Sequence, residues 1–395
     1  MTKTEIHILD SSLNYVTKIT SPVPLNKEGV ILRYSKELSD FGRCTFRISN
    51  YDSAFTTFGD IILPHSYHVR IVRGTTTVWQ GAIIENGKRN KDFTEVTAVE
   101  YVWYLGKILI KRSSNNPATS QADSIYRIFN TGTMSTAVTA VINETIARYS
   151  GSSHPLAAMT VGTVENPNYP PNMTDGNGAK LSGAWSFGNG TTGPQLVYDF
   201  HSVLYVLKSF GAYSYADFNI DSSLQFNFKK FLGNDHHYDV NFVWGQQGNT
   251  VDFNISRLGE RQTNDLWGIA VDNNGKILHQ EQTDEPSKKT NGILEGVAAY
   301  ADIKDQGTLN ARIAAELPLI STPDASADVF VLNETAYPLG VYDVGDIISA
   351  KINHTAFTYD EIKRIVGISV DVHNTGREIS TVQLNTPLPW QYGGN

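Results

Sequence analysis

The sequence predicts a mainly β fold with some α, in which two antiparallel β-barrels flank an inserted α/β middle region. Three observations favour this β-rich α+β class. The composition, with 19 Tyr, 17 Phe and 32 Gly, is typical of short strands joined by tight turns. Several segments near the N-terminus alternate polar and apolar residues, and a four-residue phrase from that region recurs near the C-terminus.

Residues 1–112 are expected to form the first barrel. Their segments alternate with a period of two, which places one face of each strand on a core. Arg73–Thr77 is expected to be a hairpin turn between two of them. The expected strands are 31–34, 44–48, 67–72, 78–84 and 94–99.

Residues 113–212 are predicted to be a helical and irregular insertion. Ile125, Ile128 and Phe129, and then a second apolar series from Val138 to Tyr149, fall at helical offsets and indicate two short helices. The Pro-, Gly- and Asn-rich stretch 151–194 is expected to be irregular. Pro194 is predicted to begin the clearest helix of the chain, which would end at Gly211.

Residues 213–320 are predicted to form a middle β-rich domain with a short helix, followed by a second barrel over 321–395. The expected hairpins join 213–220 to 224–228 and 267–271 to 276–279, the second across the turn signal Asn274-Gly275. Residues 281–290 are expected to be a polar linker, and residues 309–317 the short helix.

An internal repeat is the most informative feature of the sequence. Gly59-Asp-Ile-Ile62 recurs as Gly345-Asp-Ile-Ile348, and the same offset carries Gly81 onto Gly367 without a gap. It also carries Val96 onto Val382. The alternative is that two unrelated β domains share a common Gly-Asp turn by chance. The same offset over three segments favours a duplicated β-barrel.

The charge and cysteine content narrow the function classes. The net charge of −8 and the scattered basic pairs disfavour nucleic-acid binding, and they suit a protein that lets DNA pass without binding it. Cys44 is the only cysteine, so no internal disulfide is expected, and it should be a core residue. Neither a signal peptide nor a membrane anchor is expected, and the protein should be soluble.

Several phrases resemble the hub proteins of bacteriophage tails and contractile injection machines. Tyr337–Ile348, Arg364–Val370 and Glu378–Leu384 resemble the closing barrel of that family, and Val96–Leu105 resembles the end of its first barrel. Asn249–Ser256 with Asn264–Val271 resembles the strand pair between the barrels. The resemblance covers about half of the chain, and the stretch 115–193 matches nothing in it.

The resemblance implies a structural role in a virion tail assembled in the host cytoplasm. The barrels would be tail-tube-like, and a homotrimer would present six of them to a hexameric tube and threefold symmetry to a spike or fibre below. The implied partners are a tail tube or distal tail protein, a tape measure protein and a spike or fibre protein. Because the sequence ends eleven residues after Leu384, no lytic module is expected.

The sequence contains short matches to motifs of enzymes, but it predicts no catalytic residue, cofactor-binding residue or metal ligand. Gly188–Gly193 matches G-x-G-x-x-G, but its context does not fit a dinucleotide fold. Asp235–Asp239 lacks zinc-site spacing and should be a solvated turn. Asp272–Gly275 lacks the closing Glu of a calcium loop and should be a hairpin turn.

A receptor- or glycan-binding tail adhesin is the main alternative to a hub. Trp185, or Trp390 with Tyr392, could supply flat faces on which a sugar stacks. Core aromatic residues are the commoner explanation. A hub predicts two similar barrels and ring assembly, whereas an adhesin predicts an exposed aromatic patch with measurable sugar affinity.

Overall fold

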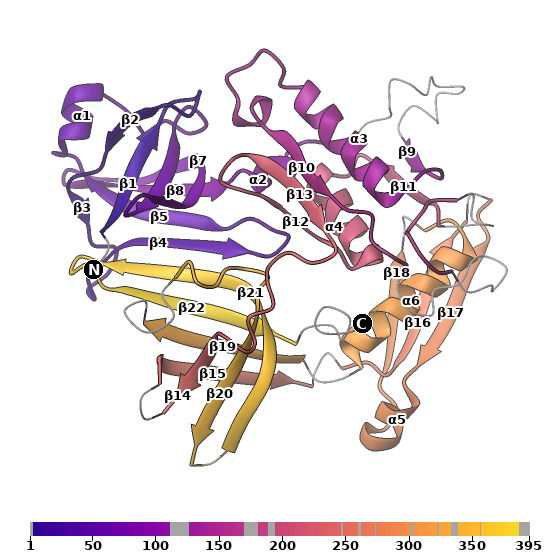
Figure 1. Cartoon of the computed structure of the whole chain (residues 1–395). Helices are drawn as coiled ribbons and strands as arrows, with labels where there is room; N and C mark the ends of the chain where they lie inside the picture. Colours follow the sequence, from indigo (N-terminus) through magenta and orange to yellow (C-terminus); the bar gives the residue numbers. More distant parts are fainter. Residues whose placement is uncertain are drawn as a thin grey trace.

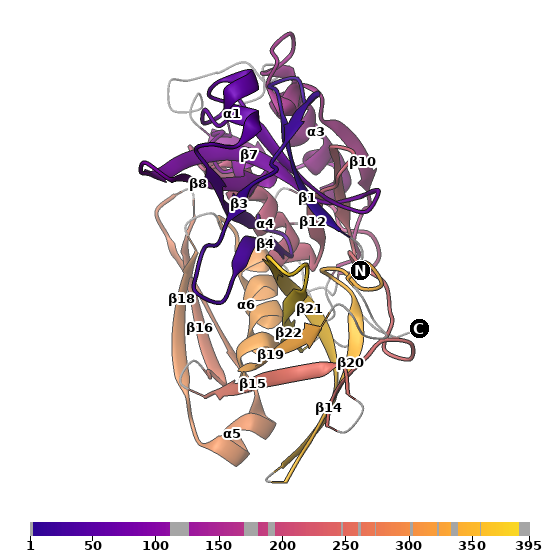
Figure 2. The same cartoon turned by 90° about the vertical axis from the view of Figure 1, so that its left-hand side faces the viewer.

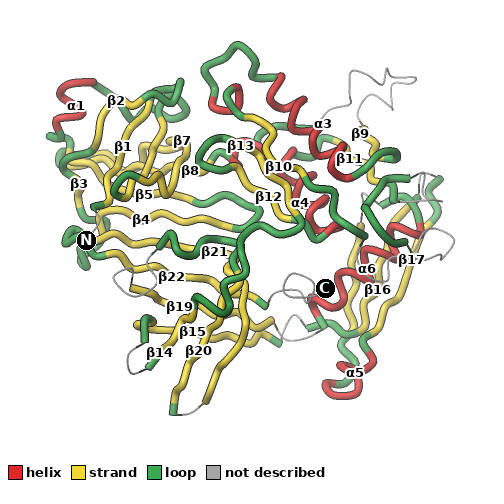
Figure 3. Tube along the Cα trace, viewed as in Figure 1, coloured by secondary structure: helices red, strands yellow, loops and turns green. Residues whose placement is uncertain are grey.

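The computed structural model describes most of the chain (Figure 1) and shows a β-rich molecule with six α-helices among the described residues. The long helices α3, α4 and α6 belong to the middle region of the sequence (Figure 3). The described residues are 3–110, 126–169, 181–188, 194–245, 248–259, 262–272, 274–300, 303–321, 324–332, 339–355 and 357–386.

The N-terminal strands form a first β module, and every strand expected in this region is present. Apolar side chains alternate with polar ones along these strands; in β5, Cys44, Phe46 and Ile48 are fully buried. The elements are β1 (Thr4–Leu9), β2 (Tyr15–Lys18), β3 (Pro22–Val23), β4 (Val30–Glu37), β5 (Arg43–Ser49), α1 (Ser53–Phe58), β6 (His68–Arg73), β7 (Thr76–Arg89) and β8 (Phe93–Glu100).

The second β module is assembled from strands on both sides of an insertion. Two of its strands precede the insertion, and the other four follow it. The strands are β14 (Asn241–Trp244), β15 (Thr250–Leu258), β19 (Asp324–Leu332), β20 (Ile347–His354), β21 (Phe357–His373) and β22 (Glu378–Asn385).

The two modules share one sheet of 14 strands (Figures 1 and 2). Its path runs β15-β19-β22-β21-β4-β5-β8-β7-β6-β1-β2, and β4 and β21 pair antiparallel where the modules meet. Among the described residues, no strand pairing closes this path into a ring. The two separate barrels therefore stay a prediction, while the β-rich class is confirmed.

Both modules have the same order of strands. In the first, β4, β5, β8, β7 and β6 lie side by side, and in the second, β15, β19, β22, β21 and β20 do so, with every neighbouring pair antiparallel. An irregularity recurs as well. The register shifts between Ile83 and Glu85 in β7 and between Ile365 and Gly367 in β21, so each long strand has a bulge at the corresponding place.

The gapless register that the sequence repeat predicted is wrong. Gly81 lies opposite Glu100, whereas Gly367 lies opposite Gln383, three residues before the expected partner Thr386. Gly59-Asp-Ile-Ile62 follows α1 as a turn, while Gly345-Asp-Ile-Ile348 leads directly into β20. The recurring phrase therefore occupies different structural positions, and the repetition lies in the strand order.

The first insertion, between β8 and β14, packs α3 and α4 with short strands. Two expectations here are wrong: Tyr126–Phe129 is a strand (β9), and Leu196–Asp199 is a strand (β11) paired with it. The helix expected from Pro194 begins only after Ser202, whose side chain caps it, and it continues past Gly211. The elements are α2 (Val102–Leu105), β9, α3 (Met134–Ala147), η2 (Pro155–Ala157), β10 (Thr160–Val164), β11, α4 (Val203–Ser214), β12 (Asp217–Ile220) and β13 (Gln225–Lys229).

A second insertion forms a three-stranded sheet covered on one face by α6. The hairpin of β16 and β17 and the helix were expected. The expected linker over 281–290 is wrong, since β17 extends into it as far as Thr283 and α5 begins at Glu285. The elements are β16 (Asp265–Val271), β17 (Ile277–Thr283), α5 (Glu285–Asn291), β18 (Glu295–Tyr300) and α6 (Gln306–Ile320).

Two hydrophobic cores follow from this arrangement. One core unites both β modules, with buried residues from Ile6 to Leu384. The other core lies in the insertions and includes Trp185, Phe210 and Leu309. The modules are therefore packed as one unit, and the inserted segments as another.

Candidate functional site

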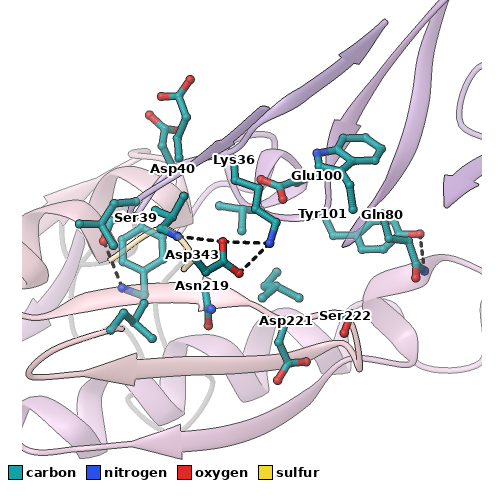
Figure 4. Close-up of a pocket in the computed structure, with 18 of the residues that line it drawn as sticks. Lys36, Ser39, Asp40, Gln80, Glu100, Tyr101, Asn219, Asp221, Ser222 and Asp343 are labelled. Atoms are coloured by element: carbon teal, nitrogen blue, oxygen red, sulfur yellow. Dashed lines mark hydrogen bonds and ion pairs between the residues drawn. The ribbon is translucent and has the colours of Figure 1, made fainter. Parts of the chain in front are cut away.

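A pocket of about 260 Å³ lies where the first module, the β12–β13 hairpin and the second module meet (Figure 4). The end of β4 and the loop after it form one wall, and β7 with the end of β8 forms another. The remaining wall comes from β12, its turn and the segment before β20. Its polar lining residues are Lys36, Glu37, Ser39, Asp40, Gln80, Glu100, Asn219, Asp221, Ser222 and Asp343.

The pocket is acidic, and two of its carboxylates, those of Asp40 and Asp343, form ion pairs that join different parts of the fold. Lys36 Nζ lies 2.7 Å from a carboxylate oxygen of Asp343, which joins β4 to the second module. Lys208, in α4, forms an ion pair with Asp40. Burial, followed by the like charge of Asp40, raises the pKa of Glu37. The two ion pairs therefore connect separate elements of the fold.

Glu100 is the most perturbed acid of the pocket. Its carboxylate accepts a hydrogen bond from the backbone N–H of Gly42 at 2.7 Å, which favours the charged form. Burial has the larger effect and raises the pKa of Glu100 to about 7. A perturbed acid in a cleft can mark a catalytic site, but catalysis also requires a reacting partner at hydrogen-bond distance.

The lining residues do not form a recognisable catalytic arrangement. Neither His nor Cys is among the residues that line this pocket. Within the described ranges, no group of three or more His, Cys, Asp or Glu side chains could hold a metal ion. The pocket is therefore a polar interface between the first module, the β12–β13 hairpin and the second module.

Buried polar contacts attach the β12–β13 hairpin to the second module. Arg364 of β21 donates from Nη2 to Asp217 Oδ2 at 2.5 Å and to the Leu232 carbonyl at 2.9 Å, and both charged side chains are buried. Asp346 accepts from the backbone N–H groups of Asn234 and Asp343 at 2.6 and 2.7 Å. The hairpin is therefore fixed to the start of β20.

The junction between the modules is a regular strand pair with its own ion pair. Seven register pairs join β4 to β21, from Gly367 opposite Glu37 to His373 opposite Val30. Arg33 binds Asp371 with two hydrogen bonds of 2.6 and 2.7 Å. This junction joins the two modules through main-chain pairing between distant segments.

The motifs with a possible chemical role lie in turns or continue into residues outside the described ranges. Gly188 is described, but Asn189–Gly193 lie outside the described residues, and the following element is an antiparallel strand instead of a helix. Tyr238, in the Asp235–Asp239 turn, is 85% exposed, as a solvated turn predicts. Asp272 Oδ1 accepts from the N–H groups of Asn274 and Lys276 in the hairpin turn, as expected.

The structure describes only one of the three aromatic residues proposed for glycan stacking. Trp185 is fully buried and contacts Phe187 and Tyr169, so it presents no face to a ligand. Trp390 and Tyr392 lie outside the described residues. Cys44 is buried in the shared core, as predicted.

Sequence reasoning missed the junction between β4 and β21. Its members are 338 positions apart at the Arg33–Asp371 contact, and no local pattern indicates pairing over that distance. The available signal was that two alternating segments carry opposite charges, Arg33 in one and Asp371 in the other. Such a signal is shared by many strand pairs and selects none of them.

Comparison with solved structures shows that the chain shares its fold with tail proteins of phages and prophages. No family model and no curated protein matches the chain. A tail protein from Neisseria meningitidis MC58 is 10% identical, with a TM-score of 0.61 and 98% of each chain covered. The 43 kDa tail protein of prophage MuSo2 from Shewanella oneidensis is 9% identical, with a TM-score of 0.57 over 97% of this chain and 98% of that one.

A third solved structure agrees with these two. Prophage tail protein gp18 from Listeria monocytogenes EGD-e is 11% identical, with a TM-score of 0.53 over 96% of this chain and 94% of that one. The similarity extends over nearly the whole length of all three proteins. In the part of the chain that the structure describes, no helix is long and apolar enough to span a bilayer.

Proposed function

Because the chain has the fold of phage and prophage tail proteins, we propose that it is a structural hub of a phage tail tip or baseplate. In this role it closes the distal end of the tail tube. The observation that carries the proposal is the strand order that the two modules share within one continuous sheet. One chain thus offers two similar surfaces side by side.

The two modules explain how a hub adapts symmetry. Three chains with two modules each supply six similar units, which match a sixfold tube, while the inserted segments repeat only three times and suit a threefold spike or fibre. The proposed partners are two further copies of the chain, a tube or distal tail protein, a tape measure protein and the spike or fibre. The acidic net charge of −8 would let DNA pass without binding.

We further propose that the modules arose by duplication and that the chain is divided as the sequence suggested, except that strands β14 and β15 belong to the second module. The proposed parts are a first module over 1–112, an insertion over 113–212, a middle domain over 213–320 and a second module over 321–395. The pairing of β14 and β15 with β20 and β19 adds these two strands to the second module. The shared strand order and the recurring bulge support the duplication.

The oligomeric mass of the purified protein tests the hub. Light scattering after size exclusion should give three times the chain mass of 43.6 kDa, and electron microscopy should show rings with six lobes. A protein that remains monomeric at all concentrations, and that binds glycans on an array, would instead support the adhesin. The non-enzymatic role is part of this proposal.

A further inference from the structure

Two strand edges of the shared sheet have no partner in the described chain. β15 pairs only with β19, so its other edge is open along nine residues. The last part of β7, from Glu85 to Arg89, pairs only with β8, because β6 ends opposite Ala82. An open edge without proline is a template for pairing with another strand.

The counterparts of these two edges are paired with each other inside the chain. β4 has the place in the first module that β15 has in the second, since each lies beside the strand next in order, β5 or β19. The part of β21 after its bulge corresponds to the part of β7 after its bulge, although β7 has a second irregularity, between Asn86 and Arg89, that β21 lacks. Within the chain, this part of β21 pairs with β4.

We propose that β15 of one copy pairs antiparallel with Glu85–Arg89 of β7 in the next copy, as β4 pairs with β21 within a copy. This inference rests on the proposed hub and names the surfaces that join its chains. The internal pair Ser35–Ser369 fixes the register. Transferred to the corresponding strands and counted on from Asn86, which matches Ile368, it places Ser256 opposite Gly87.

The surroundings of the two edges agree with this pairing. Asp343, in the segment before β20, lies beside β4 through its ion pair with Lys36. Asp60, in the segment before β6, likewise lies beside the open edge of β7, 3.5 Å from Arg89. Asn254, Glu85 and Arg89 are exposed and polar, so solvent covers both edges in the isolated chain.

The resulting interface is head-to-tail, because each copy contributes β15 on one side and β7 on the other. Such an interface closes into a ring only if the rotation per copy divides the circle evenly. If the junction between copies repeats the junction within a copy, each module is related to the next by one constant step. A ring of three copies requires this step to be one sixth of a full turn, and such a ring leaves no open edge of either kind.

Engineered disulfides test the pairing directly. Opposed residues of an antiparallel pair have Cα atoms about 4.5–5.5 Å apart, which a disulfide can span. The only native cysteine, Cys44, is buried and does not interfere. The full chain carrying Ser256→Cys and Gly87→Cys should form covalent dimers and closed trimers on mild oxidation, seen by non-reducing electrophoresis.

Single variants and a shifted pair are the controls. Ser256→Cys alone and Gly87→Cys alone should stay uncrosslinked, and a mixture of the two should give dimers only. The pair Asn254→Cys with Gly87→Cys, shifted by two residues, should crosslink at least tenfold more slowly. The pair Ser35→Cys with Ser369→Cys should close within one chain without a change in mass, as the internal junction requires.

The outcomes separate this inference from the hub itself. Trimers by light scattering without the Ser256–Gly87 crosslink would overturn the pairing and leave the hub standing. A monomer without the crosslink would contradict both. Crosslinking that requires addition of a tube protein, and that joins β15 to that protein, would assign the edge to a different partner and overturn the inference.

Discussion

At the scale of single residues, Arg364 is the side chain whose loss should cost most. It is 5% exposed, and its guanidinium binds Asp217, the Leu232 carbonyl and the Gly345 carbonyl. Removing one partner of a buried ion pair leaves an uncompensated charge. Arg364→Ala should therefore lower the free energy of unfolding by about 3–5 kcal/mol, as measured by urea denaturation.

An exposed ion pair provides the matched control for Arg364. Lys351 and Asp360 are 3.5 Å apart, with side chains 45% and 58% exposed. Surface pairs contribute at most about 1 kcal/mol, so Lys351→Ala should change the unfolding free energy by less than that. Equal losses for the two variants would show that the Arg364 contact does not fasten the hairpin to the second module.

His68 makes the stability of the fold dependent on pH. The side chain is fully buried, and neither ring nitrogen has a hydrogen-bond partner among the described residues. Burial lowers the pKa of His68 from 6.5 to about 4. The unfolded chain therefore binds a proton more readily than the folded one, so this contribution to stability is complete above pH 6.5 and is lost as the pH falls toward 4.

A substitution at His68 should reduce this pH dependence. Between pH 7 and 5, the group should remove about 2 kcal/mol from the unfolding free energy, and His68→Leu should abolish that part of the decrease. Urea denaturation at several pH values measures the slope. An unchanged slope in His68→Leu would contradict the assignment.

At the scale of elements, the two Gly-Asp-Ile-Ile phrases should respond differently to the same change. Gly59 and Gly345 both have positive φ, +75° and +100°, so alanine is strained at each by about 1–3 kcal/mol. A Cβ on Gly345 would also lie 2.2 Å from the Leu232 carbonyl oxygen, whereas one on Gly59 meets open space. The second phrase is thus in close contact with the chain after β13.

Gly345→Ala should therefore destabilise the protein by at least about 2 kcal/mol more than Gly59→Ala, since backbone overlap adds to the strain. Thermal unfolding of the two variants side by side measures the difference. Equal losses would indicate that the phrases occupy equivalent environments.

The elements also show where sequence patterns are sufficient. The strands of the first module were predictable because each has one buried and one solvated face, which produces alternation. The helix expected at Pro194 was wrong because Leu196 and Tyr198 are buried in a short strand, and apolar spacing alone does not distinguish such a strand from a helical turn. The signal for the true start was Ser202, a good N-cap residue.

At the scale of the whole molecule, the sequence predicted two β modules but not their union. The separate barrels were expected because Gly59-Asp-Ile-Ile62 recurs as Gly345-Asp-Ile-Ile348 in two regions of similar strand pattern, separated by an inserted region. The structure instead has a single core that includes Phe46 of the first module and Val370 of the second. Pairing between β4 and β21 brings these cores together, and it depends on geometry that neither strand encodes locally.

The union through β21 has a consequence for synthesis on the ribosome. β4 is complete at Glu37, but its partner strand ends at His373. At about 5–20 residues per second, roughly 20–70 seconds pass before that partner exists. Throughout this time the nascent first module has an unpaired edge, and neighbouring nascent chains on the same messenger have it too. Charged residues on an unpaired strand edge oppose aggregation, and β4 carries three of them, Arg33, Lys36 and Glu37.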